Sequence, residues 1–135
     1  MKKTLLFLLL NVFATYLFAQ CSIEPFSLQK RVDMSQLIVE GKVINKKSLW
    51  NKEQNFIYTI NSVELYKSFK GNAPAKVIEV ITEGGQVDLS RIAASPTLEL
   101  GIGEVGVFLL AENKIELLGE SQVVNRYMGV ASVQS

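Results

Sequence analysis

Histidine is absent from the 135-residue chain, and cysteine occurs once, as Cys21. Without histidine the chain cannot build a Ser-His-Asp triad, a Cys-His pair or a histidine zinc site. A single cysteine cannot form an internal disulfide, so the stability of the fold has to come from its hydrophobic core. For catalysis, the composition leaves only carboxylate or lysine chemistry.

A large charge of either sign is also missing, because 14 basic residues face 13 acidic ones. Removing the two lysines of the amino-terminal leader changes the formal charge from +1 (14 minus 13) to −1 (12 minus 13). A nearly neutral domain has no electrostatic attraction to nucleic acid or to an anionic membrane. We therefore expect neither as a partner.

The amino terminus has the three parts of a secretory signal peptide: Lys2-Lys3, an apolar segment over residues 5–18, and a small residue after it. Asn11 and Thr15 interrupt the apolar segment, which is shorter than the roughly 20 apolar residues of a membrane span. A retained anchor helix is the alternative. The leader predicts export through the general secretory pathway and a secreted, extracellular or cell-surface protein.

We expect cleavage after Ala19, so that residues 1–19 are the signal peptide, although the cut could fall after Gln20. Lipidation of Cys21 is disfavoured because the residue before it is not small. The mature chain is long enough for one domain with a single core. We assign this domain to residues 20–128 and expect the tail, residues 129–135, to lead into a longer chain.

Alternating apolar residues predict a domain made mostly of strands, preceded by one short helix that Ser27 caps. Gly41 lies within the first strand and suits a bulge or a sharp coil. The second strand changes phase near Asn61-Ser62, which predicts a β-bulge. The strands are expected at residues 37–44, 56–66, 77–82, 97–100, 105–111 and 123–127.

The segments between the strands carry further expectations. Residues 48–55 read as a polar loop that holds Trp50, and residues 88–94 as a helical turn. Residues 105–111 are apolar on both faces and predict the most buried strand. The pattern indicates an all-β fold, a small OB-like barrel of about five strands. A β-sandwich is the alternative.

Residues 101–106 match the dinucleotide-binding pattern G-x-G-x-x-G. That chemistry needs a helix to begin within the pattern, so that backbone amides point at the pyrophosphate. The residues that follow have the composition of a strand. We therefore interpret the glycines as a tight turn that leads into the strand.

Aromatic residues near two glycines form the predicted ligand or partner surface. It consists of Trp50, Phe56, Tyr58, Gly84 and Gly85. Aromatic side chains around a loop can stack on sugars or peptides. The competing interpretation is that Trp50 covers one end of the barrel.

No catalytic group is predicted, and no cofactor. Glu79, Glu83, Asp88 and Glu99 are too dispersed to name an acid–base pair, and acids on alternating strand positions usually face solvent. Calcium binding by Glu83 and Asp88 lacks a recognisable ligand spacing. Cys21 is either a free thiol on the terminus or a ligand to a zinc ion supplied in trans.

Two resemblances extend this interpretation. The first rests on Cys21-Ser22 with Pro25, the strand over residues 35–43, residues 58–60 leading to residues 65–71, and residues 77–80. These segments resemble the netrin-like domain of tissue inhibitors of metalloproteinases, which is an OB barrel. The resemblance implies that an amino-terminal cysteine lies at or near a peptidase zinc ion.

The second resemblance spans most of the chain. It rests on four segments, residues 18–20, 39–43, 82–85 and 98–108. These segments look like the amino-terminal module of large secreted Bacteroidota proteins. The resemblance implies a matrixin-type peptidase or fibronectin-like domains downstream, and a sorting domain for type IX secretion. The H-E-x-x-H motif of such peptidases is absent from this sequence.

The sequence thus predicts a non-enzymatic, secreted accessory or binding module at the amino terminus of a larger extracellular protein. Its partners would be downstream domains of the same protein or an extracellular protein or peptidase. The alternative is a regulatory or inhibitory pro-region that acts on a zinc metallopeptidase.

Overall fold

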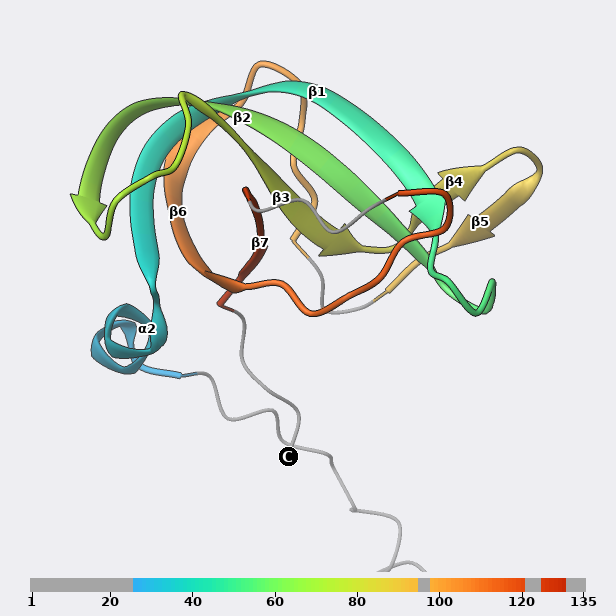
Figure 1. Cartoon of the computed structure of the whole chain (residues 1–135), viewed down its shortest axis with the longest axis horizontal. Helices are drawn as coiled ribbons and strands as arrows, with labels where there is room; N and C mark the ends of the chain where they lie inside the picture. The colour runs from blue at the N-terminus through green and yellow to red at the C-terminus, as the bar shows by residue number, and fades with distance from the viewer. Residues whose placement is uncertain (1–25, 95–97, 121–124, 131–135) are drawn as a thin grey trace, which may run out of the picture.

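Five strands close into a barrel in the computed structural model, which describes residues 26–94, 98–120 and 125–130 (Figure 1). The elements are α2 (Leu28–Met34), β1 (Leu37–Trp50), β2 (Ile57–Lys70), β3 (Val77–Glu83), β4 (Gly85–Val87), β5 (Ser90–Ile92), β6 (Val105–Glu112) and β7 (Arg126–Gly129). The barrel order is β1-β2-β3-β7-β6, with β6 pairing back to β1, while β4 and β5 form a separate hairpin.

The pairing directions identify the type of barrel. Strands β1, β2 and β3 form an antiparallel meander, β3 pairs with β7 in parallel, and β6 is antiparallel to both β7 and β1. A five-stranded barrel in this order, with one parallel pair between its third and last strands, is OB-like. The predicted all-β class and OB-like barrel are confirmed, and the sandwich alternative is wrong.

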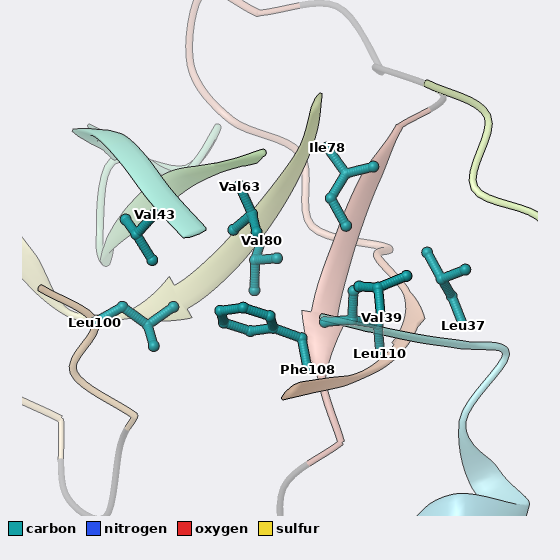
Figure 2. Packing of buried hydrophobic residues seen from close by; sticks show 9 residues of the cluster. All are labelled: Leu37, Val39, Val43, Val63, Ile78, Val80, Leu100, Phe108 and Leu110. Carbon is teal, nitrogen blue, oxygen red and sulfur yellow. The ribbon is translucent and has the colours of Figure 1, made fainter. Parts of the chain in front are cut away.

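Apolar residues at alternate strand positions fill the interior of the barrel, because successive side chains of a strand point to opposite faces. Figure 2 shows these side chains converging from four strands and from the segment before β6. The interior cluster consists of Leu37, Val39, Val43, Val63, Ile78, Val80, Leu100, Phe108 and Leu110. In β3, Ile78 and Val80 point inward and Glu79 outward.

Gly41 lies at one of the irregular points of β1. The pairing of β1 with β2 shifts register between Glu40 and Gly41, and Gly41 pairs with Leu65 on one side and Gly106 on the other. A β-carbon added to Gly41 would lie 2.6 Å from the backbone oxygen of Glu64. The predicted irregularity at Gly41 is therefore confirmed, and only glycine allows β2 to approach β1 this closely.

The predicted bulge at Asn61-Ser62 is wrong for β2, which pairs with β3 without a break from Tyr58 to Glu64. The irregularity lies opposite, in β1 between Val43 and Asn45. The apparent change of phase arises because β2 is apolar on both faces. Val63 belongs to the interior, whereas Ile60 belongs to an outer cluster with Ile81 and Leu117.

That outer cluster lies on the outside of β1, β2 and β3, beneath the connection from β6 to β7. Around Ile60, Ile81 and Leu117 pack Leu49, Tyr58, Ile115 and Met128. The connection is held to the end of β1 by hydrogen bonds from the Leu118 amide to the Trp50 carbonyl (2.9 Å) and from the Lys52 amide to the Glu116 carbonyl (3.1 Å).

Two of the predicted loops and turns are corrected. Trp50 is the last residue of β1 rather than part of a polar loop, so that only residues 51–56 connect β1 to β2. Residues 88–94 form no helical turn, because β4 and β5 pair as a hairpin around Asp88-Leu89. Asp88 has a φ of 51°, a left-handed conformation that aspartate tolerates and that suits a tight hairpin.

Strand β6 was predicted to be the most buried strand, and this prediction is wrong. Phe108 and Leu110 point into the barrel, but Val105 and Val107 are 52% and 55% exposed. Their outward face has no described element packed on it, so apolar composition alone overstated the burial.

The remaining predicted elements differ at their ends. Residues 98–100 form no strand, and residue 97 lies outside the described residues. The last strand begins at Arg126 rather than 123, and residues 123–124 also lie outside the described part. The Ser27 hydroxyl accepts a hydrogen bond from the Lys30 amide (3.2 Å), which confirms the predicted cap of α2.

Candidate functional site

The five residues of the predicted binding surface gather at one end of the barrel. Trp50 and Ile57 pair where β1 passes into β2, and the Gly84 amide donates to the Ile57 carbonyl (2.9 Å). The start of β4 therefore lies against the end of the β1–β2 hairpin, beside the short loop 51–56 (Figure 1).

The aromatic residues do not form one continuous face. The rings of Phe56 and Tyr58 are 5.0 Å apart between centroids and tilted by 52°. Tyr58 pairs with Leu49, whereas Trp50 pairs with Ile57. Because neighbouring positions of a strand face opposite ways, the half-buried Trp50 lies on the other face of the hairpin from the Phe56–Tyr58 pair.

Tyr58 packs its ring against the outer cluster. Burial raises the pKa of its phenol above the ordinary value of 10.0, and the negative charges of Glu83 and Glu53 raise it further. The phenol therefore stays protonated at neutral pH, so that Tyr58 offers a hydrogen-bond donor and an aromatic edge, not a charge.

The two glycines bring the backbone into close contact with β1 and β2. A β-carbon on Gly85 would lie 2.5 Å from the Thr59 hydroxyl oxygen and 2.6 Å from that of Ser48. The Thr59 hydroxyl also donates to the Gly84 carbonyl (2.8 Å). These contacts fix the base of the β4–β5 hairpin, so the glycines position an element instead of lining an open site.

The β4–β5 hairpin projects from the barrel at this end (Figure 1). Its tip carries Leu89, whose side chain is fully exposed. Sequence reasoning missed this residue, because the segment looked like a helical turn. The signal that could have found it is the Asp88-Leu89 pair between two short polar-apolar runs.

A cluster of charged side chains joins the connection between β6 and β7 to the barrel. The Arg126 guanidinium, only 4% exposed, pairs with the carboxylates of Glu79 (2.7 Å) and Glu120, and Glu120 also pairs with Lys47 (3.0 Å). Burial would by itself raise the pKa of the Glu120 carboxyl. The hydrogen bonds and positive charges of Arg126 and Lys47 outweigh burial, and the pKa is lowered.

An open groove of about 530 Å³ runs beside this cluster, lined by Lys52, residues 115–120 and Arg126. Its lining carries both signs of charge in pairs that satisfy one another, including Lys52 with Glu116 (2.6 Å). The groove therefore presents no uncompensated charge that would select an anion or a cation.

Asn61 is a buried polar residue that sequence reasoning also missed. Its side chain is fully buried, and its amide nitrogen donates to the Val80 carbonyl (2.9 Å) and the Thr82 hydroxyl (3.1 Å). Among the described residues, its amide oxygen has no hydrogen-bond partner. The hydrogen bonds of its amide nitrogen join β2 to β3, so the role of Asn61 is structural.

Three of the carboxylates that the sequence left too dispersed for an acid–base pair have separate places in the fold. Glu79 is tied to Arg126, Asp88 forms the hairpin turn, and Glu99 is exposed before β6. Within the described ranges, no group of three or more His, Cys, Asp or Glu side chains could hold a metal ion. Cys21, the predicted zinc ligand, lies outside the described residues.

The glycine motif at residues 101–106 is a turn at Ile102-Gly103 followed directly by β6, as predicted, and no helix begins there. Across the residues that the structure describes, no helix is long and apolar enough to cross a membrane.

Comparisons with known proteins gave no match: none to protein-family models, none to curated proteins and none to solved structures. The two family resemblances drawn from the sequence therefore stay predictions.

Proposed function

We propose that this chain is a non-catalytic binding module, which acts outside the cytoplasm as an accessory part of a larger extracellular protein. The observation that carries the proposal is the β4–β5 hairpin, with a fully exposed leucine at its tip and a base that is locked to the barrel.

A two-stranded hairpin is only marginally stable in water by itself. Here the Thr59 hydroxyl and the close approach of Gly85 to Ser48 hold its base. The barrel thus supports a projecting element whose tip adds nothing to the described core. A large apolar side chain displayed in this way is suited to a pocket on a partner.

The composition favours a protein as that partner. Asp88 and Arg91 place one charge of each sign on the hairpin, and the mature chain is nearly neutral. Nucleic acid and anionic membranes both need a concentration of positive charge, which this hairpin does not provide.

The test places a photoreactive benzoylphenylalanine at Leu89 in the secreted protein and, as a matched control, at Leu28, which is 64% exposed on α2. We expect one discrete crosslinked partner from position 89 and none from position 28. The partner, once purified, should bind Leu89→Ser about tenfold or more weakly than wild type, at an unchanged melting temperature. Equal crosslinking from both positions, or equal affinity, would contradict the proposal.

Export has its own test, because the leader lies outside the described residues. Amino-terminal sequencing of protein from the culture medium should begin at Gln20, or at Cys21 if the cut falls one residue later. Protein that stays in the cells with residues 1–19 attached would contradict secretion.

The second candidate function is inhibition of a zinc metallopeptidase. The OB-like barrel supports it in one respect, since this is the fold that the resemblance to metalloproteinase inhibitors implies. The purified mature chain is added to a matrixin-type peptidase, and cleavage of a peptide substrate is followed. Inhibition by wild type that Cys21→Ser abolishes would favour this function, whereas unchanged cleavage with both would end it.

A further inference from the structure

The first half of β6 has a strand on one side only. β1 pairs with β6 from Val105 to Leu110, but β7 pairs only with Leu110, Ala111 and Glu112. The edge of β6 from Val105 to Phe108 that faces away from β1 therefore has no strand beside it among the described residues.

Three hydrogen bonds establish which polar groups point to this edge. The carbonyls of Glu104 and Leu110 accept from β1 and the residue before it, whereas the Leu109 carbonyl accepts from the Val130 amide (2.8 Å) on the opposite side. In an antiparallel ladder the backbone groups of successive residues alternate in direction. The amides and carbonyls of Val105 and Val107 therefore point to the open edge.

This edge lacks the usual protection against pairing. Proteins protect a free strand edge with charged side chains, proline or a covering element. The residues from Val105 to Ala111 include no charge and no proline, and the side chains of Val105 and Val107 are more than half exposed. Inside the barrel, a β-carbon on Gly106 would meet no atom of the described residues within 4 Å. Within the described part of the chain, this edge therefore has no strand to complete its backbone hydrogen bonds, and the space beside Gly106 is open.

We infer that this edge is a strand-binding site and that its occupant is residues 131–134 of the same chain, which follow β7 and lie outside the described residues. The pairing of β6 with β7 is already established up to Val130 opposite Leu109. Continuing that register places Ser132 opposite Val107 and Gln134 opposite Val105. The inference is independent of the proposed binding function.

The side chains in this register agree with the two faces of the barrel. Tyr127 packs against the interior cluster and Met128 against the outer cluster, so odd positions of this strand point inward. Ala131 and Val133 would then point inward, while the polar residues between and after them face solvent. In this register Val133 would lie opposite Gly106.

The test measures hydrogen exchange by NMR in the full mature chain, at the amides of Val105 and Val107. Gly106 serves as an internal reference, because its amide points to β1. Val133→Asp should speed exchange at Val105 and Val107 by about tenfold or more and leave Gly106 unchanged. The matched variant Ser132→Asp, whose side chain faces solvent in this register, should leave all three amides protected.

A chain that ends after Val130 provides a second measurement. Its Val105 and Val107 amides should exchange rapidly, and a synthetic peptide of residues 129–135 should restore their protection. Equally rapid exchange at both amides in the full chain would overturn the inference. Protection that grows with protein concentration would also overturn it, because the strand would then come from a second copy.

Discussion

Gly41 and Gly106 pair directly across β1 and β6, yet the structure predicts opposite results when each is replaced by alanine. An alanine β-carbon at position 41 would lie 2.6 Å from the Glu64 backbone oxygen and 2.7 Å from a methyl carbon of Val63. At position 106 the same atom would meet nothing within 4 Å in the parts of the chain that the structure describes.

The loss of stability in Gly41→Ala depends on whether the atoms around the new β-carbon can move away. The Glu64 carbonyl belongs to the β1–β2 ladder, so it cannot withdraw without disturbing strand pairing. Overpacking of this kind costs about 1–3 kcal/mol. Replacing glycine by alanine also stabilises a protein by about 0.4–1 kcal/mol where the native φ suits alanine, because the unfolded chain becomes less flexible. Neither glycine has a left-handed φ.

We therefore expect Gly41→Ala to lower the free energy of unfolding by about 1–2 kcal/mol, or about 4–8 °C in Tm for each kcal/mol. Gly106→Ala should be neutral or stabilising by about 0.5 kcal/mol. Urea unfolding followed by the fluorescence of Trp50, the single tryptophan, measures both. Equal stability of the two variants would refute the claim that close approach of β2 requires glycine at position 41.

Four further substitutions have definite expected results. Arg126→Met should lower stability by about 2 kcal/mol, less than for a fully buried pair because its carboxylate partners are 31% and 23% exposed. In the wild type the pKa of the Glu120 carboxyl is lowered, so the stability that its ionised form contributes is lost as the pH falls through that pKa. Urea unfolding between pH 7 and pH 3 should therefore show a smaller decrease in stability for Arg126→Met than for the wild type. Asn61→Asp should destabilise the fold by about 3 kcal/mol or more at pH 7, because a buried carboxylate would face the Val80 carbonyl. The loss of stability should be smaller toward pH 4, where the carboxyl is protonated, and an equal loss at both pH values would contradict this reasoning. Phe108→Ala should cost about 3–5 kcal/mol and the neighbouring Val107→Ala about 0.5, as thermal unfolding can measure.

The alternation of apolar residues was enough to predict the barrel strands wherever one face of the strand is buried and the other is exposed to solvent. Val39 and Val43 in β1, and Ile78 and Val80 in β3, alternate with charged neighbours, and each points into the barrel. Gly41 could be predicted as an irregular point because a side chain is missing in the middle of a strand.

Alternation failed where the second face is covered by a distant segment. Ile60 and Tyr58 are buried by Leu117, which lies more than 50 residues away in the sequence. Nothing local indicates this contact, so the two apolar phases of β2 looked like a bulge. In β6 the error was reversed, since Val105 and Val107 looked buried but have no described cover.

The predicted binding residues were correctly placed near one another, but their roles were not predictable. Trp50 pairs with Ile57, and a shift of one residue in the pairing of β1 with β2 would instead place it on the same face as Tyr58. The role of Gly85 depends on the hydroxyls of Ser48 and Thr59, which it meets only because β4 packs against β1 and β2 in the folded chain.

The covered outer face also bears on where a partner can bind. OB barrels commonly bind ligands on the face of their second and third strands, between the loop after the first strand and the loop before the last. In this chain Leu117 packs on that face and is buried there. The ion pairs of Lys52 with Glu116 and of Lys47 with Glu120 tie the same connection to β1 and the loop after it. A ligand on this face would first have to displace the outer cluster. The β4–β5 hairpin requires no such displacement, because Leu89 is already exposed, and for this reason we place the partner contact on the hairpin rather than on the usual face of the fold.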